Sequence, residues 1–162
     1  LLEEAERLRE SLLALVEADA GAFEPVMRAY RLPSGSAAER LERARVLEAA
    51  LEGACEAPLE IMERCAGALR LLEGFAEKGN SSALSDAGAG ACLCRAALVA
   101  ASLNVYANTR VMADRERAAE FDRRAGDLLA RWEPAADELI RSVRAALGQA
   151  PSGAFAPANP AP

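Results

Sequence analysis

The sequence predicts an all-α protein, a bundle of about five long helices. Composition is the first reason, because the 162 residues include 39 alanines and 22 leucines but only seven aromatic side chains, which favours helices packed through small residues. The second reason is that apolar residues recur at helical spacing nearly throughout, without the alternation typical of strands. The length suits one domain. So slender a bundle leaves apolar surface exposed, which predicts a helical homodimer.

The first helical region covers residues 1–30, where apolar side chains follow a helical spacing. Pro25 lies inside this pattern, and a proline within a helix removes an N–H donor and clashes with the preceding turn. We therefore expect a kink or a break, with a second helix beginning near Asp19 or Gly21. Residues 31–36, RLPSGS, form a loop.

The next region carries clear signals for helix ends. Ser36 and Glu39 have the spacing of a capping box, in which each side chain accepts a hydrogen bond from the other residue's main-chain N–H. A helix is therefore predicted over residues 37–55. Pro58 suits the first turn of a further helix, where its missing N–H costs nothing. That helix ends near Gly79, a residue suited to a left-handed C-cap.

The most apolar stretch of the chain begins at Asp86. Arg95, Asn104 and Asn108 interrupt it, which argues against a membrane span. A helix that is apolar on all sides has to be covered on all sides. We therefore expect this helix to be central in the bundle and mostly buried.

Small residues and prolines shape the rest of the chain. Gly88 and Gly90, with alanines around them, leave room for another backbone to come close. The last helix is predicted over residues 114–147, with a bend at Pro134. Residues 148–162, GQAPSGAFAPANPAP, form a low-complexity tail that is predicted to be disordered or extended.

The composition also excludes several classes of function. Without histidine, the chain lacks the commonest general base and the usual ligand of zinc, and we expect no metal site. The net charge of −6 at pH 7 argues against non-specific binding to nucleic acid or to an anionic membrane. The cysteines are Cys55, Cys65, Cys92 and Cys94. They lack CxxC spacing, and we interpret them as buried small hydrophobes of a cytoplasmic protein.

Three blocks of sequence, in this order, resemble one family of enzymes. They are residues 19–33, DAGAFEPVMRAYRLP; residues 57–62, APLEIM; and residues 79–88, GNSSALSDAG, continuing to NVYAN at 104–108 and to Asp114. Together they are similar to the cyclodeaminase/cyclohydrolase family of folate enzymes. That family includes the C-terminal half of formiminotransferase-cyclodeaminase and stand-alone methenyltetrahydrofolate cyclohydrolases. The resemblance spans about residues 1–147 and implies an all-α homodimer with a folate site in a cleft near the subunit interface.

Two features depart from the family pattern. The family normally places a basic residue after the RLP block, where this chain has Ser34. The family also carries a Gly-rich segment of the P-x-P-G-G-G-S-x-A type, which lines the folate site and is absent from the printed sequence. Because Leu1 is not a methionine and LLEEAERLRE has the pattern of a helix interior, we expect further sequence upstream.

The resemblance implies chemistry at the one-carbon bridge of tetrahydrofolate. Cyclodeamination converts the 5-formimino form into the 5,10-methenyl form and releases ammonia, whereas cyclohydrolysis adds water to the methenyl carbon. Both reactions pass through a tetrahedral carbon beside a cationic amidinium, which a carboxylate can stabilise while it moves protons. The resemblance favours the cyclodeaminase, with the cyclohydrolase and a non-catalytic helical scaffold as alternatives. The substrate is a tetrahydrofolate derivative, and no cofactor is expected.

Asp86 and Asp19 are the candidate catalytic residues, and the resemblance assigns them. From the residues alone, Ser85 or Asp86 is an N-cap of the apolar helix, and Asp19 is a cap or a solvated helix residue. The resemblance makes Asp86 the carboxylate beside the amidinium, where the positive end of the helix keeps it ionised. It makes Asp19 a second acid or base.

The candidate substrate-binding residues are Tyr30, Arg31, Pro33, Asn80, Ser85, Asn104 and Asn108. Arg31 either meets the glutamate carboxylates of folate in a bidentate bond or is an ordinary surface arginine. Asn104 and Asn108 lie four residues apart on one helix face. They recognise the pterin, contact a second subunit, or form a buried pair satisfied across helices.

Overall fold

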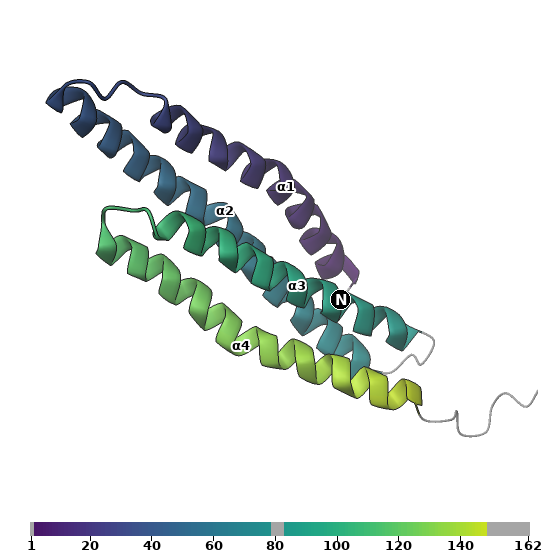
Figure 1. Cartoon of the computed structure of the whole chain (residues 1–162). Helices are drawn as coiled ribbons and strands as arrows, with labels where there is room; N and C mark the ends of the chain where they lie inside the picture. The colour runs from purple at the N-terminus through teal and green to yellow at the C-terminus, as the bar shows by residue number, and fades with distance from the viewer. Residues whose placement is uncertain (1, 79–82, 149–162) are drawn as a thin grey trace, which may run out of the picture.

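The computed structural model describes residues 2–78 and 83–148, which form four helices and no strand (Figure 1). The helices are α1 (Leu2–Tyr30), α2 (Ala37–Lys78), α3 (Leu84–Thr109) and α4 (Arg115–Gly148). The all-α prediction is confirmed, and the count of about five helices is corrected to four. The predicted C-cap Gly79 and residues 149–162 of the predicted tail lie outside the described residues.

The count differs because two prolines do not end their helices. α1 continues through Pro25 and α2 through Pro58, so the predicted helix start near Asp19 or Gly21 is wrong. The two helices predicted over residues 37–55 and from Pro58 onward are likewise one. A proline removes a single intrahelical hydrogen bond. In these long helices the packing on both sides of the proline outweighs that loss.

The central element is α2, which packs against each of the other three helices. α3 also packs against α4, whereas α1 approaches α2 alone. Consecutive helices run antiparallel, as Figure 1 shows, so α1 and α3 point in the same direction. The prediction that the helix after Asp86 is central is therefore wrong for the single chain.

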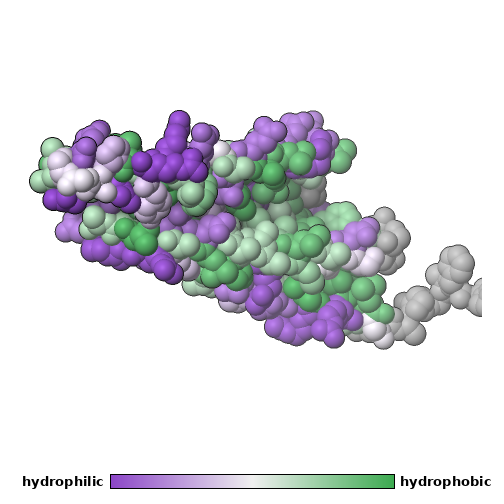
Figure 2. All heavy atoms as spheres, turned by 45° about the horizontal axis from the view of Figure 1, so that its top comes forward, coloured by the Kyte–Doolittle hydropathy of each residue, from purple (hydrophilic) through white to green (hydrophobic). Residues whose placement is uncertain are grey.

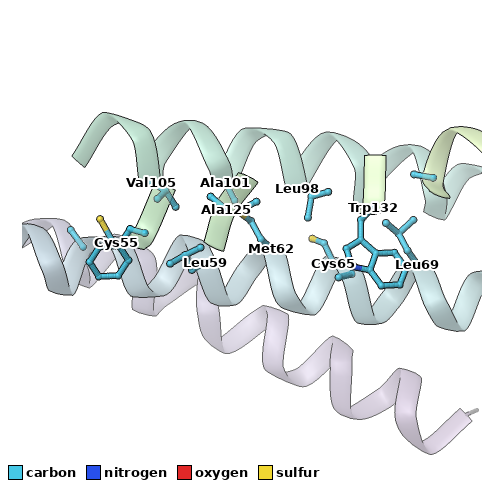
Figure 3. Close-up of a cluster of buried hydrophobic side chains, with 14 of the residues drawn as sticks. Cys55, Leu59, Met62, Cys65, Leu69, Leu98, Ala101, Val105, Ala125 and Trp132 are labelled. Carbon is cyan, nitrogen blue, oxygen red and sulfur yellow. The ribbon is translucent and has the colours of Figure 1, made fainter. Parts of the chain in front are cut away.

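The hydrophobic core lies between α2, α3 and α4. Its largest fully buried side chains include Leu51, Leu59, Met62, Leu69, Leu98, Val105 and Phe121. Trp132 of α4 closes the same cluster beside Cys65 and Leu69 of α2 (Figure 3). Each such side chain contributes roughly 1.5–3 kcal/mol when it is removed from water.

Two of the helix starts are capped by side chains, the first of them as predicted. The main-chain N–H of Glu39 donates to Ser36 Oγ at 3.2 Å, and the N–H of Ser36 donates to Glu39 Oε2 at 2.7 Å. The capping box is thus confirmed, and these bonds lower the pKa of the Glu39 carboxyl. At the start of α4, Asp114 Oδ1 accepts bonds of 3.0 and 2.9 Å from the N–H groups of Glu116 and Arg117.

The start of α3 differs from its prediction. The helix begins at Leu84, and Ala83 at the N-cap position offers no side-chain hydrogen bond. Ser85 and Asp86 therefore lie inside the first turn, and both are exposed. The prediction that one of them is the N-cap is wrong. A carboxylate in the first turn still interacts favourably with the positive end of the helix.

Much of α3 is uncovered in the single chain. Leu93 is 72% exposed and Leu103 is 61% exposed, so the prediction of a mostly buried helix is wrong for one chain. Among the described helices, α3 alone has the length and apolar composition to cross a membrane, and 28% of its most apolar window is buried. The charged residue in this window, Arg95, forms ion pairs with Glu133 at 3.2 Å and Asp137 at 2.7 Å on α4.

The two glycines of α3 contact side chains rather than another backbone. A Cβ added at Gly88 would lie 2.9 Å from Val143 Cγ1 of α4. One added at Gly90 would lie 3.1 Å from Leu72 Cδ1 of α2. The close approach predicted at these positions is therefore made by branched side chains that fill the space a Cβ would need.

The cysteines divide into two kinds. Cys55 and Cys65 are buried in the core, which confirms the prediction for these two. Cys94 is half-buried, and Cys92 is exposed on α3, so the prediction of four buried thiols is wrong for Cys92.

Candidate functional site

A small cavity of about 250 Å³ lies where α1, α2 and α3 meet. It is lined by Asp19, Ala22 and Phe23 of α1, Ala54 of α2, and Asn104, Ala107 and Asn108 of α3. The structure therefore brings together three of the predicted site residues, Asp19, Asn104 and Asn108, from distant parts of the sequence. Asp19 is the one charged residue of this lining.

The packing of α1 places Asp19 at the edge of the cavity. The inner face of α1 buries Leu15, Val26 and Ala29, and Asp19 is half-buried beside that face, on the side of α3. Phe23 follows one turn later and keeps 54% of its surface exposed. A carboxylate and an aromatic ring thus lie next to each other on the same wall.

Asn108 is positioned by a hydrogen bond between helices. Its side-chain Nδ2 donates to the main-chain oxygen of Ala54 at 2.9 Å. Ala54 is four residues before Pro58, so its carbonyl has lost the N–H donor that an α-helix normally supplies. This bond uses one N–H of the Asn108 amide, and the amide oxygen and second N–H remain for other partners.

The cavity combines chemical groups that suit a polar aromatic ligand. Asp19 can accept a proton or stabilise a cation, as a general base does. Asn104 and Asn108 each offer both donors and acceptors, and the exposed ring of Phe23 offers an apolar face. The volume is below the roughly 300–1,000 Å³ that is common for sites holding drug-sized ligands.

Another group of predicted residues lies at the end of α1. Tyr30, Arg31 and Pro33 are exposed and do not line the cavity. Tyr30 follows Asp19 by eleven residues, which places it about 16 Å further along the helix axis. Within one chain, these residues therefore lie apart from Asp19 and the cavity.

The remaining predicted residues are also separate. Ser85 and Asp86 lie at the opposite end of α3 from the cavity. Asp86 precedes Asn104 by eighteen residues, which corresponds to about 27 Å along the helix. Asn80 lies outside the described residues. A catalytic role for Asp86 stays a prediction, and in one chain this carboxylate does not reach the cavity.

A larger groove lies at the end of the bundle near the start of α3. It encloses about 590 Å³ between the ends of α2, α3 and α4, and its charged lining residues are Glu73, Glu77 and Glu138. These carboxylates disfavour an anionic ligand, and no predicted site residue lines the groove. Among residues 2–78 and 83–148, no three histidine, cysteine or acidic side chains are grouped so as to hold a metal ion.

The part of the chain that forms the cavity matches a known protein family. A sequence profile of formiminotransferase-cyclodeaminase matches residues 1–127. The chain belongs to this family. The matched region contains every residue that lines the Asp19 cavity. The resemblance inferred from the three sequence blocks is therefore confirmed.

Individual members of the family cover different shares of the chain. A methenyltetrahydrofolate cyclohydrolase of Methylorubrum extorquens is 35% identical over 144 residues, which is 89% of this chain and 69% of that protein. Formimidoyltransferase-cyclodeaminases of Mus musculus and Sus scrofa are 35% and 31% identical, over 64% and 73% of this chain. The chain spans only 19% and 22% of the length of those two proteins.

In this formiminotransferase-cyclodeaminase family member, the sequence prediction missed part of the cavity lining. Phe23 and Ala54 were not among the predicted site residues, although each left a signal. Phe23 is an aromatic residue one helical turn after Asp19. Ala54 stands four residues before Pro58, a spacing that marks a carbonyl in need of a donor. Ala22 and Ala107 carry no comparable signal.

Proposed function

We propose that this chain is a folate one-carbon enzyme that binds 5,10-methenyltetrahydrofolate in the Asp19 cavity. This compound is the product of cyclodeamination and the substrate of cyclohydrolysis, so the proposal covers both reactions. The observation that carries it is the cavity lining, in which one carboxylate stands beside two carboxamides within the region that matches the family.

Asp19 supplies the acid–base chemistry in this proposal. For hydrolysis, its carboxylate accepts a proton from the attacking water while the water oxygen bonds to the methenyl carbon. The bond between that carbon and N5 then breaks, and Asp19 returns the proton to N5. The remaining hydroxyl proton leaves to solvent, and the carbon stays on N10 as a formyl group. Before the water adds, the negative charge of Asp19 stabilises the amidinium cation of the substrate.

The other lining residues orient the substrate. Asn108 is held by its bond to Ala54, so its amide presents a fixed donor and acceptor to the edge of the pterin. Asn104 adds a second amide one turn earlier on α3. The ring of Phe23 packs against the flat face of the pterin, a contact that aromatic rings favour.

Of the two reactions, hydrolysis is favoured by one observation. The relative that aligns with 89% of this chain, and with 69% of its own length, is a methenyltetrahydrofolate cyclohydrolase. The cyclodeaminase reaction favoured by the GN…SDAG and NV..N blocks stays the second candidate. It is supported by the formimidoyltransferase-cyclodeaminase relatives.

The proposal also covers the oligomeric state, location and partners of the protein. We infer a cytoplasmic homodimer that uses no cofactor or metal and engages neither nucleic acid nor membrane. The exposed Leu93 and Leu103 of α3 support the dimer, because large apolar side chains in a row on a soluble surface mark an interaction site. The net charge of −6 supports the absence of a nucleic acid partner.

Two assays on purified protein test this function. Loss of the methenyltetrahydrofolate absorbance reports hydrolysis, and ammonia release from 5-formiminotetrahydrofolate reports cyclodeamination. We expect the first to proceed faster than the uncatalysed background. Neither activity, together with no binding of either folate by titration calorimetry, would leave the chain as a helical scaffold. Ammonia release without hydrolysis would reverse our choice between the two reactions.

A further inference from the structure

A further cavity, of about 350 Å³, lies between α1 and α2. We name it the Arg cavity, because its lining includes Arg7 of α1 and Arg64 and Arg70 of α2, together with the carboxylates Glu4 and Glu63. Guanidinium groups therefore outnumber carboxylates in it, whereas the charged lining residues of the Asp19 cavity and of the groove at the end of the bundle are all acidic. An excess of positive charge in a concave site attracts anions.

The Arg cavity is separate from the Asp19 cavity. The two share no lining residue. At about 100° per residue, Arg7 and Asp19 point about 120° apart around the axis of α1, and Gly67 and Ala54 point about 140° apart around the axis of α2. Polar and apolar surface are also segregated on the face seen in Figure 2, with mostly hydrophilic residues along its upper edge and hydrophobic residues gathered below them. The two cavities therefore face different sides of the α1–α2 pair.

Two of the arginines carry a charge that no neighbouring carboxylate neutralises. Among residues 2–78 and 83–148, neither Arg7 nor Arg70 forms an ion pair with a carboxylate. The carboxylate of Glu63 is already engaged by Arg124 of α4, at 3.6 Å. Both Arg7 and Arg70 are exposed, so an anion that enters the cavity from solvent meets two accessible, uncompensated positive charges.

Neighbouring side chains hold the two arginines of α2 in place. Arg64 donates through Nη2 to Glu60 Oε1 at 2.7 Å, and its Nε–H is buried without a hydrogen-bond partner among the described residues. The Cζ of Arg70 lies 5.6 Å from the centre of the Trp132 ring, a favourable cation–π distance. Side chains that are already ordered lose less freedom when a ligand binds. An acceptor beside Arg64 would also supply a partner that this buried donor lacks.

Gly67 keeps the space beside these arginines open. A Cβ added at Gly67 would lie 3.3 Å from Leu8 Cδ2 and 3.8 Å from Arg70 Nη2, so a larger side chain would fill the part of the cavity next to the guanidinium group. Across from it, Ser11 of α1 contributes a hydroxyl to the lining, which can donate a further hydrogen bond. The volume falls within the roughly 300–1,000 Å³ that is common for small-molecule sites, so the cavity has room for more than a bare ion.

We propose that the Arg cavity binds the phosphate group of a small molecule. A phosphate monoester carries about two negative charges at pH 7, which matches the two uncompensated charges of Arg7 and Arg70. Its oxygens point in several directions and can accept hydrogen bonds from guanidinium groups of both helices, whereas a carboxylate offers two oxygens in one plane. Because it joins Arg7 of α1 to Arg64 and Arg70 of α2, the bound phosphate also holds the start of α1 against α2.

Isothermal titration calorimetry with inorganic phosphate and with ribose 5-phosphate tests this site without an enzyme assay. The titrations are made at neutral pH and constant ionic strength, so that screening is equal throughout. We expect saturable binding at one site per chain and a rise in melting temperature. Tighter binding of ribose 5-phosphate identifies an ester as the ligand, and equal binding identifies the free ion.

A dicarboxylate serves as the control for charge alone. Succinate carries two negative charges at neutral pH but no phosphate oxygens, and it should bind at least about tenfold more weakly than either phosphate probe. No saturable heat with either phosphate probe overturns the proposal. Succinate binding as tight as that of phosphate overturns it too, because the site would then respond to charge and not to the phosphate group.

Variants of the lining locate the binding. R7Q/R70Q should raise the Kd for phosphate by about tenfold or more, because it removes charged donors to the ligand. The matched control is R9Q/R45Q, which removes two exposed arginines of the same helices outside the cavity and should leave the Kd within about twofold. Gly67→Val keeps every charge but fills the cavity, so it should also weaken binding. Unchanged binding in R7Q/R70Q, or in a Gly67→Val protein whose circular dichroism is that of the wild type, overturns the site.

Trp132 provides a local reporter of the same event. It is the only tryptophan in the sequence, and Arg70 lies over its ring, so phosphate binding should change its fluorescence with the midpoint that calorimetry gives. Arg70→Gln should abolish this change, and Arg45→Gln should preserve it. Calorimetric binding that leaves the Trp132 fluorescence of the wild type unchanged would place the anion away from Arg70 and overturn the site.

Discussion

The side-chain amide of Asn108 on α3 donates a hydrogen bond of 2.9 Å to the main-chain oxygen of Ala54 on α2. Pro58 deprives that oxygen of its donor within α2, so a residue of a neighbouring helix replaces the missing N–H. The bond offsets the hydrogen bond that α2 loses at its proline, and it fixes an amide at the edge of the cavity. Asn108 thus contributes both to the stability of α2 and to the geometry of the cavity.

Replacing Asn108 by alanine should destabilise the protein by about 1–3 kcal/mol, because the Ala54 carbonyl is then left without a partner. Urea unfolding followed by circular dichroism measures this loss. A P58A background tests the cause, since alanine at position 58 restores the N–H within α2. There the Asn108 substitution should cost less, with a coupling of about 1 kcal/mol. An equal cost in both backgrounds would contradict the view that the Asn108 amide replaces the N–H missing at Pro58.

Asp19→Asn should lower turnover by about 10²–10⁴-fold, the usual range for loss of a general base. The melting temperature should change little, because the asparagine keeps the size of the side chain. Turnover is measured by the loss of methenyltetrahydrofolate absorbance. Glu17→Gln is the matched control, since Glu17 is an exposed carboxylate of the same helix that does not line the cavity. Similar turnover in the two variants would remove Asp19 from the mechanism.

Gly88→Ala should destabilise the contact between α3 and α4. The new Cβ would lie 2.9 Å from Val143 Cγ1, and overpacking of this kind costs about 1–3 kcal/mol. Gly53→Ala is the control, because a Cβ at Gly53 meets nothing within 4 Å. That variant should gain about 0.4–1 kcal/mol from its reduced unfolded-state entropy. Thermal unfolding of both proteins gives the comparison, and a stabilised Gly88→Ala would show that Val143 moves aside freely.

The thiols should differ sharply in reactivity at pH 8. Burial raises the pKa of Cys55 and of Cys65 to about 12, so only about one in ten thousand of these groups is a reactive thiolate. We expect Ellman's reagent to label the exposed Cys92 quickly and these two only after unfolding. Cys92→Ser should remove the fast phase, and a fast phase that survives this change would refute the assignment.

The same thiols predict a loss of stability in alkali. Their pKa in the folded protein lies above the ordinary value of 9.0, so the folded state holds these protons more tightly than the unfolded chain does. Their contribution to the free energy of unfolding is therefore complete below pH 9, and it is lost as the pH rises from about 9 to about 12. Urea midpoints of the C55A/C65A variant and the wild type, measured across this range, should converge as the pH rises.

Local signals in the sequence determined the helices and several of their ends. The hydrogen bonds of Ser36 with Glu39, and those of Asp114 with the first turn of α4, involve residues within three positions of one another. Such contacts form wherever the chain turns into a helix, so pattern alone predicts them. The pattern favours a kink or a break at Pro25 and a new helix at Pro58, whereas α1 and α2 continue through both residues, because the cost of a proline depends on what packs around it.

The composition of the site was determined in part by the sequence as well. The resemblance to the folate family predicts Asp19, Asn104 and Asn108 as site residues, and the structure groups them in one cavity. It also predicts Asp86, Tyr30 and Arg31, which lie away from this cavity in one chain. Sequence order carries no information on which of these side chains meet, because their separation depends on helix lengths and on how α1 and α3 lie against α2.

Only the tertiary structure decided which face of α3 stays uncovered. The helix is apolar on all sides, so no periodicity distinguishes the side that packs on α2 and α4 from the side that does not. In the fold, Leu98 and Val105 are buried, while Leu93 and Leu103 remain exposed. The difference arises because α1 rests on α2 alone and leaves that flank of α3 without a neighbouring helix.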